Sequence, residues 1–236
     1  MGEPEQADPT LIPDFSCMDP AECFVGKRYI HARANYMLES DNIMDLLHIE
    51  FLHAGTLGSD AVRSSVGRVE QTAHTVWSYR QTTNEVMSDF LYDSMGLPRG
   101  LPVDRWFDVR WDAPACMLLY AGATPTGQPR SAGPPQLLFP HFFTPETERT
   151  THYWFSATMP RAIGENGAQI VEHIAGDLNK HPFTDEDLPM LEAQQRAMGD
   201  ADFWSLRPVL LAGDAGAVRA RRVLDRLIAD ELAARN

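Results

Sequence analysis

The segment 40–55 restricts the fold of this chain more than any other, because it mixes ionisable groups with large apolar side chains. Two histidines, His48 and His53, and three acidic residues lie among seven large apolar residues. A solvated charged segment would not carry so many apolar side chains, so we expect the segment to lie inside the protein. Buried ionisable groups are costly unless they are paired or bind a metal. The segment is therefore a candidate site.

The spacing within this segment predicts a helix that is interrupted. Apolar residues recur at helical positions, and Gly55 is a suitable C-terminal stop. Asp45 and His48 are three apart and share a helix face. His48 and His53 are five apart, roughly 140° around an ideal helix, so a shared metal requires the helix to end, loosen or bulge between them. Two histidines and one carboxylate with open positions hold oxygen-activating Fe(II); the alternative is two hydrogen-bonded core histidines.

The pattern Asp41-Asn42-x-x-Asp45-x-x-His48-x-x-x-x-His53 resembles the iron-binding motif of Rieske-type non-haem iron oxygenases. The similarity is greatest to the branch that contains the vanillate O-demethylase oxygenase subunit and dicamba monooxygenase. It extends over nearly the whole chain, through the segments 2–4, 7–9, 12–15, 35–38, 103–111, 144–148, 152–153, 186–187 and 192–193.

This resemblance implies a ligand set for mononuclear Fe(II) composed of His48, His53 and the distant Asp187. It implies that Asp45 is the electron-transfer bridge to the Rieske cluster of a neighbouring subunit, and that Asn42 lies near the iron. Spacing alone favours another role for Asp187, because Thr184 resembles a helix N-cap with a capping-box acid three residues later. The resemblance favours the ligand.

The segments 137–143 and 149–157 are expected to form two strands of a hairpin, joined through residues 144–147. They carry His141 and His152 among aromatic residues. One interpretation is an aromatic sheet core. The other is a substrate-pocket wall, because pockets are mostly apolar with a few placed polar groups. Under the second hypothesis His141, His152 and Trp154 contact the substrate.

Composition excludes several classes of protein. A chain of 236 residues with 44% hydrophobic residues can bury a core, and a net charge of −13 argues against nucleic acid. The same charge means that an anionic substrate would need a local basic contact. With no apolar run long enough for a membrane span and no signal peptide, we expect a soluble, cytoplasmic protein that does not bind membranes.

The three cysteines are expected to be reduced thiols, because they form no paired framework. The resembled family holds its [2Fe-2S] Rieske cluster with Cys-x-His and Cys-x-x-His, and neither pattern occurs here. We therefore expect a fragment, a truncated gene model, or a protein without its electron-entry domain, three alternatives that the sequence leaves open. Residues 1–24 are interpreted as a linker from a missing Rieske domain, and residues 25–236 as the mononuclear-iron catalytic domain.

Strands followed by helices predict an α+β fold with an antiparallel sheet. Helices are expected over 164–180, 185–199 and 215–234. In the last of these, residues 218, 224, 227, 228 and 232 should face inward and residues 219, 221, 222 and 226 should form a solvated arginine face. The resemblance implies a helix-grip (START-like) architecture, with the sheet wrapped on a long C-terminal helix.

The resemblance further implies an aromatic-catabolic oxygenase that uses O2 and external electrons, a monooxygenase or dioxygenase. The favoured reaction is O-demethylation of a methoxylated aromatic acid or phenol, with ring hydroxylation left open. Electrons would come from NAD(P)H through a reductase or ferredoxin partner and the Rieske cluster, within a homotrimer. Alone, the chain should bind iron without turning over. Two alternatives are a non-catalytic helix-grip module that binds an apolar ligand and an inactive remnant.

Overall fold

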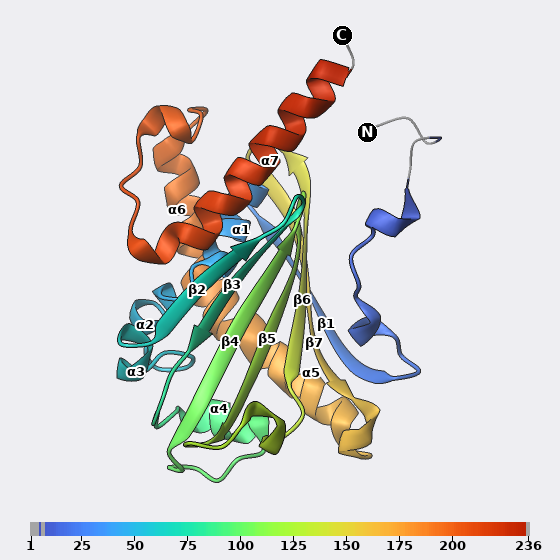
Figure 1. Ribbon diagram of the computed structural model, residues 1–236, viewed down its shortest axis with the longest axis vertical. Helices are drawn as coiled ribbons and strands as arrows, with labels where there is room; N and C mark the ends of the chain where they lie inside the picture. The colour runs from blue at the N-terminus through green and yellow to red at the C-terminus, as the bar shows by residue number, and fades with distance from the viewer. Residues whose placement is uncertain (1–4, 6–7, 235–236) are drawn as a thin grey trace.

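A single antiparallel sheet of seven strands organises the molecule, in the order β1-β7-β6-β5-β4-β3-β2 (Figure 1). The computed structural model describes residue 5 and residues 8–234. The α+β class predicted from the sequence is confirmed by this sheet and its helices. The strands are β1 (Cys23–Ala32), β2 (Val66–Gln71), β3 (Thr75–Gln81), β4 (Val103–Asp112), β5 (Cys116–Pro125), β6 (Leu137–Thr147) and β7 (Thr150–Pro160).

The hairpin of β6 and β7 is tighter than the sequence suggested. Residues 144–147 belong to β6 and are not a loop, and the turn lies between Thr147 and Thr150. A register shift between Pro145 and Thr147 absorbs the proline, which cannot donate to the strand ladder. Because side chains alternate along a strand, the hairpin presents opposite residues to the two faces of the sheet.

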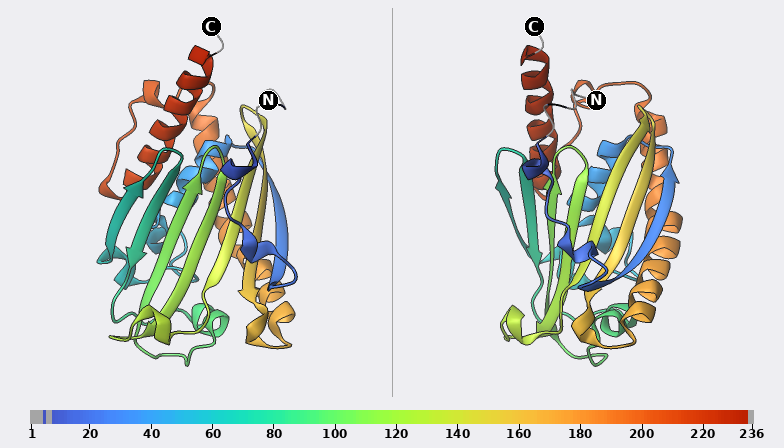
Figure 2. Two further views of the ribbon diagram at one scale, coloured as in Figure 1. Left: turned by 45° about the vertical axis from the view of Figure 1, so that its right-hand side comes forward. Right: turned by 90° about the vertical axis from the view of Figure 1, so that its right-hand side faces the viewer.

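One long helical rod crosses the inner face of the sheet, where two separate helices were expected. It consists of α5 (Gly167–Leu178), a π-helical segment (Asn179–Asp187) and α6 (Leu188–Met198). Pro182 lies inside the π-helical segment, whose wider turns tolerate a residue that cannot donate to the regular ladder. The α5 portion packs against β1 and β7 (Figure 2).

The C-terminal helix α7 (Ala215–Ala234) packs against the rest of the molecule up to Leu227, and its end extends past the sheet (Figure 1). Its N-terminal half contacts β2, β3 and α1. Two residues expected to face inward, Ile228 and Leu232, are 46% and 56% exposed. Arg221, expected on a solvated face, is instead buried and donates to the Asp41 carboxylate through Nε and Nη2. Ile228 and Leu232 are exposed because α7 continues beyond the elements that could cover it. Arg221 is buried because it lies on the packed part of α7, where it pairs with Asp41 on α1.

The remaining helices are short and close the inner face of the sheet. They are α1 (Tyr36–Met44), α2 (His48–Phe51), α3 (Asp60–Arg63) and α4 (Asp89–Met95). Single 3-10 turns lie at Pro9–Leu11, Ser16–Met18, Arg130–Ala132, Arg161–Ile163, Trp204–Leu206 and Ala212–Asp214. Within the described part of the chain, no helix combines the length and the apolar character that crossing a bilayer requires.

The N-terminal segment runs over the outer face of the sheet, opposite the helices (Figure 2). The rings of Phe15 and Phe142 lie 4.7 Å apart, and Arg110 on β4 donates to the carbonyl of Asp14 over 2.8 Å. Residues 1–4, 6 and 7, on which part of the family resemblance rested, lie outside the described residues. The hydrophobic core therefore lies on the other face, between the sheet and α1, α4 and α5.

Candidate metal centre

The helix that carries His48 ends before His53, as their spacing required, because α2 stops at Phe51. A second break precedes α2. α1 ends at Met44, Asp45 adopts an extended conformation, and α2 begins at His48. The Asp45 side chain stabilises this break, because its Oδ1 accepts the backbone N–H of Leu47 over 2.9 Å. His53 follows the end of α2, and its carbonyl accepts three successive backbone N–H groups of the next turn. The two imidazoles can therefore point to one place.

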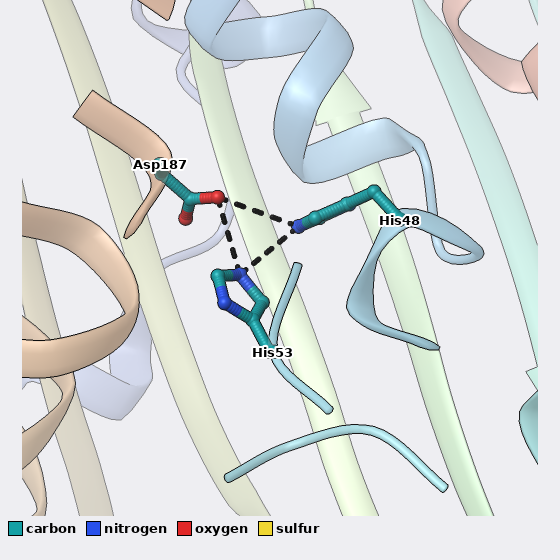
Figure 3. Close-up of side chains that lie close together, drawn as sticks. All are labelled: His48, His53 and Asp187. Carbon is teal, nitrogen blue, oxygen red and sulfur yellow. Dashed lines mark hydrogen bonds and ion pairs between the residues drawn. The ribbon is translucent and has the colours of Figure 1, made fainter. Parts of the chain in front are cut away.

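The structure brings His48, His53 and Asp187 together (Figure 3). His53 Nε2 lies 3.1 Å from Asp187 Oδ1 and 3.2 Å from His48 Nε2, and His48 Nε2 lies 3.6 Å from the same carboxylate oxygen. Ligands about 2.1 Å from a common ion, at right angles to one another, are separated by about 3 Å. The three donor atoms thus have the separations of a two-histidine, one-carboxylate metal site.

The hydrogen bonds behind the imidazoles fix which nitrogen faces the centre. His53 Nδ1–H donates to Glu186 Oε2 over 2.6 Å, and His48 Nδ1–H donates to the Asp45 carbonyl over 2.5 Å. In the neutral rings both Nε2 atoms therefore direct lone pairs at the centre. Glu186 was not predicted as a site residue; its position next to Asp187 was the available signal.

The charge at the centre is uncompensated without a cation. Asp187 is 3% exposed, and among the described residues neither of its carboxylate oxygens has a hydrogen-bond donor. Burial would lower the pKa of His53, but Asp187 and Glu186 together raise it above its ordinary value. A site that attracts a proton onto Nε2 also attracts a metal ion there. Three acceptor atoms that converge in a buried position fit a divalent cation.

Asp187 reaches the centre from the π-helical segment, at its junction with α6. Spacing alone favoured a helix cap for this residue. Because the helix continues through residue 184, there is no helix start to cap, and Asp187 makes no capping hydrogen bond within the described part of the chain. The wider turn places Glu186 and Asp187 together on the side that faces the histidines, consistent with the frequent occurrence of π-bulges at functional sites.

An apolar cavity of about 110 Å³ opens beside the three residues. It lies between the sheet, α2, α4 and α5, and most of its lining consists of aromatic and aliphatic side chains. His141 on β6 reaches this cavity, as expected for a pocket residue. Asp45 lines the same cavity and also borders a surface groove on its other side. Asn42 borders that groove and a small space behind Asp187, outside the main cavity.

His152 and Trp154 do not reach the cavity, so a substrate contact by either is withdrawn. They lie on the outer face of β7, where Trp154 is 50% exposed and His152 Nδ1 is 2.7 Å from the Tyr29 hydroxyl. Their neighbours Tyr153 and Phe155 point inward and are buried. The expectation was wrong because adjacent strand residues face opposite sides of the sheet, and the sequence did not give the phase.

A second buried acid near the centre escaped the sequence analysis. Glu39 on α1 is buried, its Oε1 has no hydrogen-bond partner among the described residues, and it shares a small space with Asp187. Burial, reinforced by the negative charges of Asp187 and Glu192, raises the pKa of Glu39 to about 8. Below that pH Glu39 is neutral and does not add to the negative charge at the centre.

The fold and site together place two histidines and one carboxylate in the arrangement of a two-histidine, one-carboxylate metal centre, in an α+β domain beside an apolar cavity. Residues 32–230 match the family described as the vanillate O-demethylase oxygenase C-terminal domain. The chain belongs to this family, which confirms the resemblance.

Similar proteins support the same assignment. The chain is 33% identical over 235 residues to the oxygenase component of a chloroacetanilide N-alkylformylase from Rhizorhabdus wittichii, covering 98% of this chain and 66% of the relative. It is 31% identical to the dicamba O-demethylase oxygenase component of Stenotrophomonas maltophilia, covering 96% and 65%. The chain thus spans about two thirds of the length of these relatives.

Solved structures agree with this fold. A crystal structure of dicamba monooxygenase bound to 3,6-dichlorosalicylic acid superposes with a TM-score of 0.86, at 29% identity, covering 98% of this chain and 67% of that one. A second dicamba monooxygenase structure, with non-haem iron and dicamba, has a TM-score of 0.74 at 28% identity and covers 99% and 65%.

Proposed function

We propose that this chain is the catalytic domain of a Rieske-type oxygenase that binds one Fe(II) through His48, His53 and Asp187. The observation that carries the proposal is the convergence of three acceptor atoms, from the buried His53 and Asp187 and the partly buried His48, with separations of 3.1 to 3.6 Å, beside an apolar cavity. Membership of the family, and a similar structure that contains non-haem iron, support iron over other cations.

Each residue of the centre has a role that follows from its contacts. His48, His53 and Asp187 would hold the ion, which would supply O2 activation at its open positions. Glu186 and the Asp45 carbonyl keep the Nδ1 protons in place, so that both Nε2 atoms can bind metal. The apolar cavity wall excludes water from the substrate.

The reaction we favour is O-demethylation of a methoxylated aromatic, with ring hydroxylation as the alternative. One oxygen atom of O2 would enter a methyl C–H bond, and the other would leave as water with two electrons and two protons. The resulting hemiacetal collapses to a phenol and formaldehyde. The name of the Stenotrophomonas maltophilia relative, an O-demethylase component, supports this choice.

The two electrons would come from NAD(P)H through a reductase or ferredoxin and a [2Fe-2S] Rieske cluster. Asp45 is the proposed bridge, because it is in contact with both the cavity and a surface groove bordered by Asp41, Leu210 and Arg221. A homotrimer, in which one subunit's cluster serves another's iron, is the assembly we infer from the family resemblance. Residues 25–236 would form the catalytic domain, residues 1–24 the segment that leads into it, and a cytoplasmic location remains a prediction.

A second candidate function is a non-catalytic module that binds an apolar ligand, favoured by the almost wholly apolar cavity. Iron content separates it from the oxygenase. The full chain, incubated anaerobically with Fe(II) and desalted, should retain about one iron per chain if the oxygenase proposal holds. Retention of no iron would refute the proposal and favour the binding module or an inactive remnant.

Electron entry is tested with Asp45→Asn in a system reconstituted with NADH, a reductase and a Rieske protein. This variant should keep its iron and lose formaldehyde production, whereas the exposed control Asp60→Asn should keep both. Undiminished, coupled turnover by Asp45→Asn would contradict the bridging role.

A further inference from the structure

We infer that the cavity selects an electrically neutral substrate, such as an aromatic ether or amide without a carboxylate or sulfonate. The inference rests on the proposed function and names the substrate class of its site. The sequence left open whether the substrate is an aromatic acid or an uncharged phenol, and the inference favours the uncharged class.

The cavity wall offers an anion almost nothing to bind. Its lining includes Phe90 and Phe107, Leu119 and Phe139, and Ile174 and Leu178. A carboxylate moved from water into such surroundings loses its hydration, and the cost is several kcal/mol unless a cation or several hydrogen-bond donors replace the water. The question is therefore which positive charges face the cavity.

Arg105 on β4 is the sole lysine or arginine among the described residues of the lining, and its charge is already neutralised. Its Nε donates to Glu85 Oε2 over 3.0 Å, its Nη2 lies 2.9 Å from Glu85 Oε1, and its Nη1 donates to the Leu57 carbonyl over 2.9 Å. Both partners are buried, Arg105 at 3% and Glu85 at 1% exposure.

Glu85 is itself held in place, so it cannot be displaced cheaply by a substrate. Its Oε2 accepts from the Thr82 hydroxyl over 2.5 Å and its Oε1 accepts from the Ser59 hydroxyl over 2.7 Å. A substrate carboxylate next to Arg105 would make a site with two negative charges and one positive charge. In a buried location the excess charge is unfavourable.

His141 provides a hydrogen bond and no charge. It is fully buried, and its Nδ1 lies 2.7 Å from the Tyr153 hydroxyl, while its Nε2 has no partner among the described residues. Burial lowers the pKa of His141 to about 3, so the ring is neutral at physiological pH. A Tyr153 hydroxyl that donates to Nδ1 leaves the proton on Nε2, where it can bind the oxygen of an ether or an amide.

The metal centre does not supply the missing positive charge either. A ferrous ion would bring two positive charges, which Asp187 at 3.1 Å and Glu186 at 2.6 Å from the His53 nitrogens balance. Asp45 at the cavity wall adds a further negative charge. With the whole chain at −13, the cavity is neutral or negative toward an incoming ligand.

The test compares two probes of nearly equal shape, 4-methoxybenzamide and 4-methoxybenzoate, which share the ring and the methyl ether and differ in charge. Calorimetric titration under anaerobic conditions gives the dissociation constant of each for the metal-free and the iron-loaded full chain. We expect the amide to bind at least about 10-fold more tightly in both forms, because a ten-fold ratio needs only about 1.4 kcal/mol. A benzoate affinity equal to or above that of the amide in either form would overturn the inference, including by direct ligation to iron.

A charge-releasing variant supplies the second measurement. Glu85→Gln keeps hydrogen-bonding atoms near Arg105 and Thr82 but leaves the guanidinium charge without a counter-charge. The ratio of the dissociation constants of the amide and the benzoate should therefore shift by at least about 10-fold in favour of the benzoate. The matched control is Asp108→Asn on β4, the strand of Arg105, which removes an acid paired with Arg130 on the outer face and should leave the ratio of the two dissociation constants unchanged. A folded Glu85→Gln with the wild-type ratio would refute the neutralising role of Glu85.

The two proposals can fail separately. If Glu85→Gln does not fold, as judged by circular dichroism, the wild-type ratio still decides the substrate class. A chain that binds no iron but prefers the amide would refute the oxygenase and retain the neutral cavity. An iron-loaded chain that turns over 4-methoxybenzoate and binds it more tightly than the amide would support the oxygenase and refute the neutral cavity.

Discussion

Two histidine clusters lie on opposite faces of the same sheet, and they differ in what surrounds them. The inner cluster of His48, His53 and Asp187 is nearly closed to water. The outer cluster places His31 Nε2 at 2.8 Å and His152 Nε2 at 3.8 Å from the two oxygens of Glu146, and all three of its side chains are at least one-third exposed. Each set has two histidines and one carboxylate, but among the described residues only the inner set brings one donor atom from each residue within 4.8 Å of the others.

The difference shows that residue type alone does not make a candidate metal centre, because the donor atoms must also converge and be shielded from water. Water already solvates the charges of the outer cluster, so its contacts contribute little to stability. The inner carboxylate has no such solvation and no hydrogen-bond donor among the described residues. A cation is therefore favoured only inside the protein.

The largest effect should come from breaking the inner cluster. Asp187→Ala removes the only carboxylate of the proposed ligand set, so the affinity for Fe(II) should fall by more than about 100-fold, beyond the loss typical of residues behind a ligand. The measurement is iron per chain after anaerobic loading and desalting. The matched control is Glu146→Ala, which removes the acid of the outer cluster and should leave iron content unchanged. Equal iron content in the two variants would refute the claim that the inner cluster binds iron and the outer cluster does not.

The second largest effect should be a difference in stability between substitutions on the inner and the outer face of β7. Phe155→Ala removes a ring that is 1% exposed and packs against Phe183, and it should lower the free energy of unfolding by about 3–5 kcal/mol. Trp154→Ala removes a half-exposed ring that contacts Tyr29 and should cost about 1 kcal/mol. Urea unfolding of both variants checks this. Similar losses would show that the face assignment is incorrect.

The inner acid Glu39 should make the metal-free protein less stable as the pH rises. Its pKa is about 8 in the folded state against 4.5 for the ordinary residue, so the folded state retains a proton that the unfolded state loses. Stability should fall by about 3 kcal/mol between pH 5 and pH 8 from this group. Glu39→Gln should remove that slope in urea unfolding. If Glu39→Gln kept the wild-type dependence of unfolding free energy on pH, Glu39 would not be the group responsible.

The outer acid Glu146 should affect the pH dependence of stability with the opposite sign to Glu39, and this effect should be the smallest of the four. Hydrogen bonds from His31 and Thr150 lower its pKa, so its stabilising contribution is present above pH 4.5 and is lost as the pH falls through the folded-state value. Glu146→Gln should melt slightly below the wild type at pH 7, and this difference should shrink as the pH falls below 4.5. A difference that grows at low pH would reverse the assigned sign.

Local features of the site were predictable because they depend on neighbours in the chain. The five-residue step from His48 to His53 required the helix to end or loosen between them, and α2 ends at Phe51, before His53. The antiparallel α+β class likewise follows from the order of strand and helix patterns. Asp187, in contrast, was assigned through resemblance alone, because its local spacing resembled a helix cap.

Other features required the packed fold. His152 and Trp154 were assigned to the pocket and lie on the outer face, because a shift of one residue in strand phase exchanges the faces. Arg221 was assigned to solvent and is buried against Asp41, 180 residues away in the chain. Contacts of this range depend on how distant elements pack, and no local periodicity encodes them.

The sequence by itself determined the chemistry of the donors, which are two imidazoles at a fixed local spacing and a set of acids. It could do so because residue type and short-range helix geometry depend only on residues that are close in the chain. Only the tertiary structure decided which acid meets the imidazoles and that Glu85 neutralises Arg105 beside the cavity. The physical reason is that burial sets the cost of a charge, and burial exists only once the sheet and the helical rod have packed together.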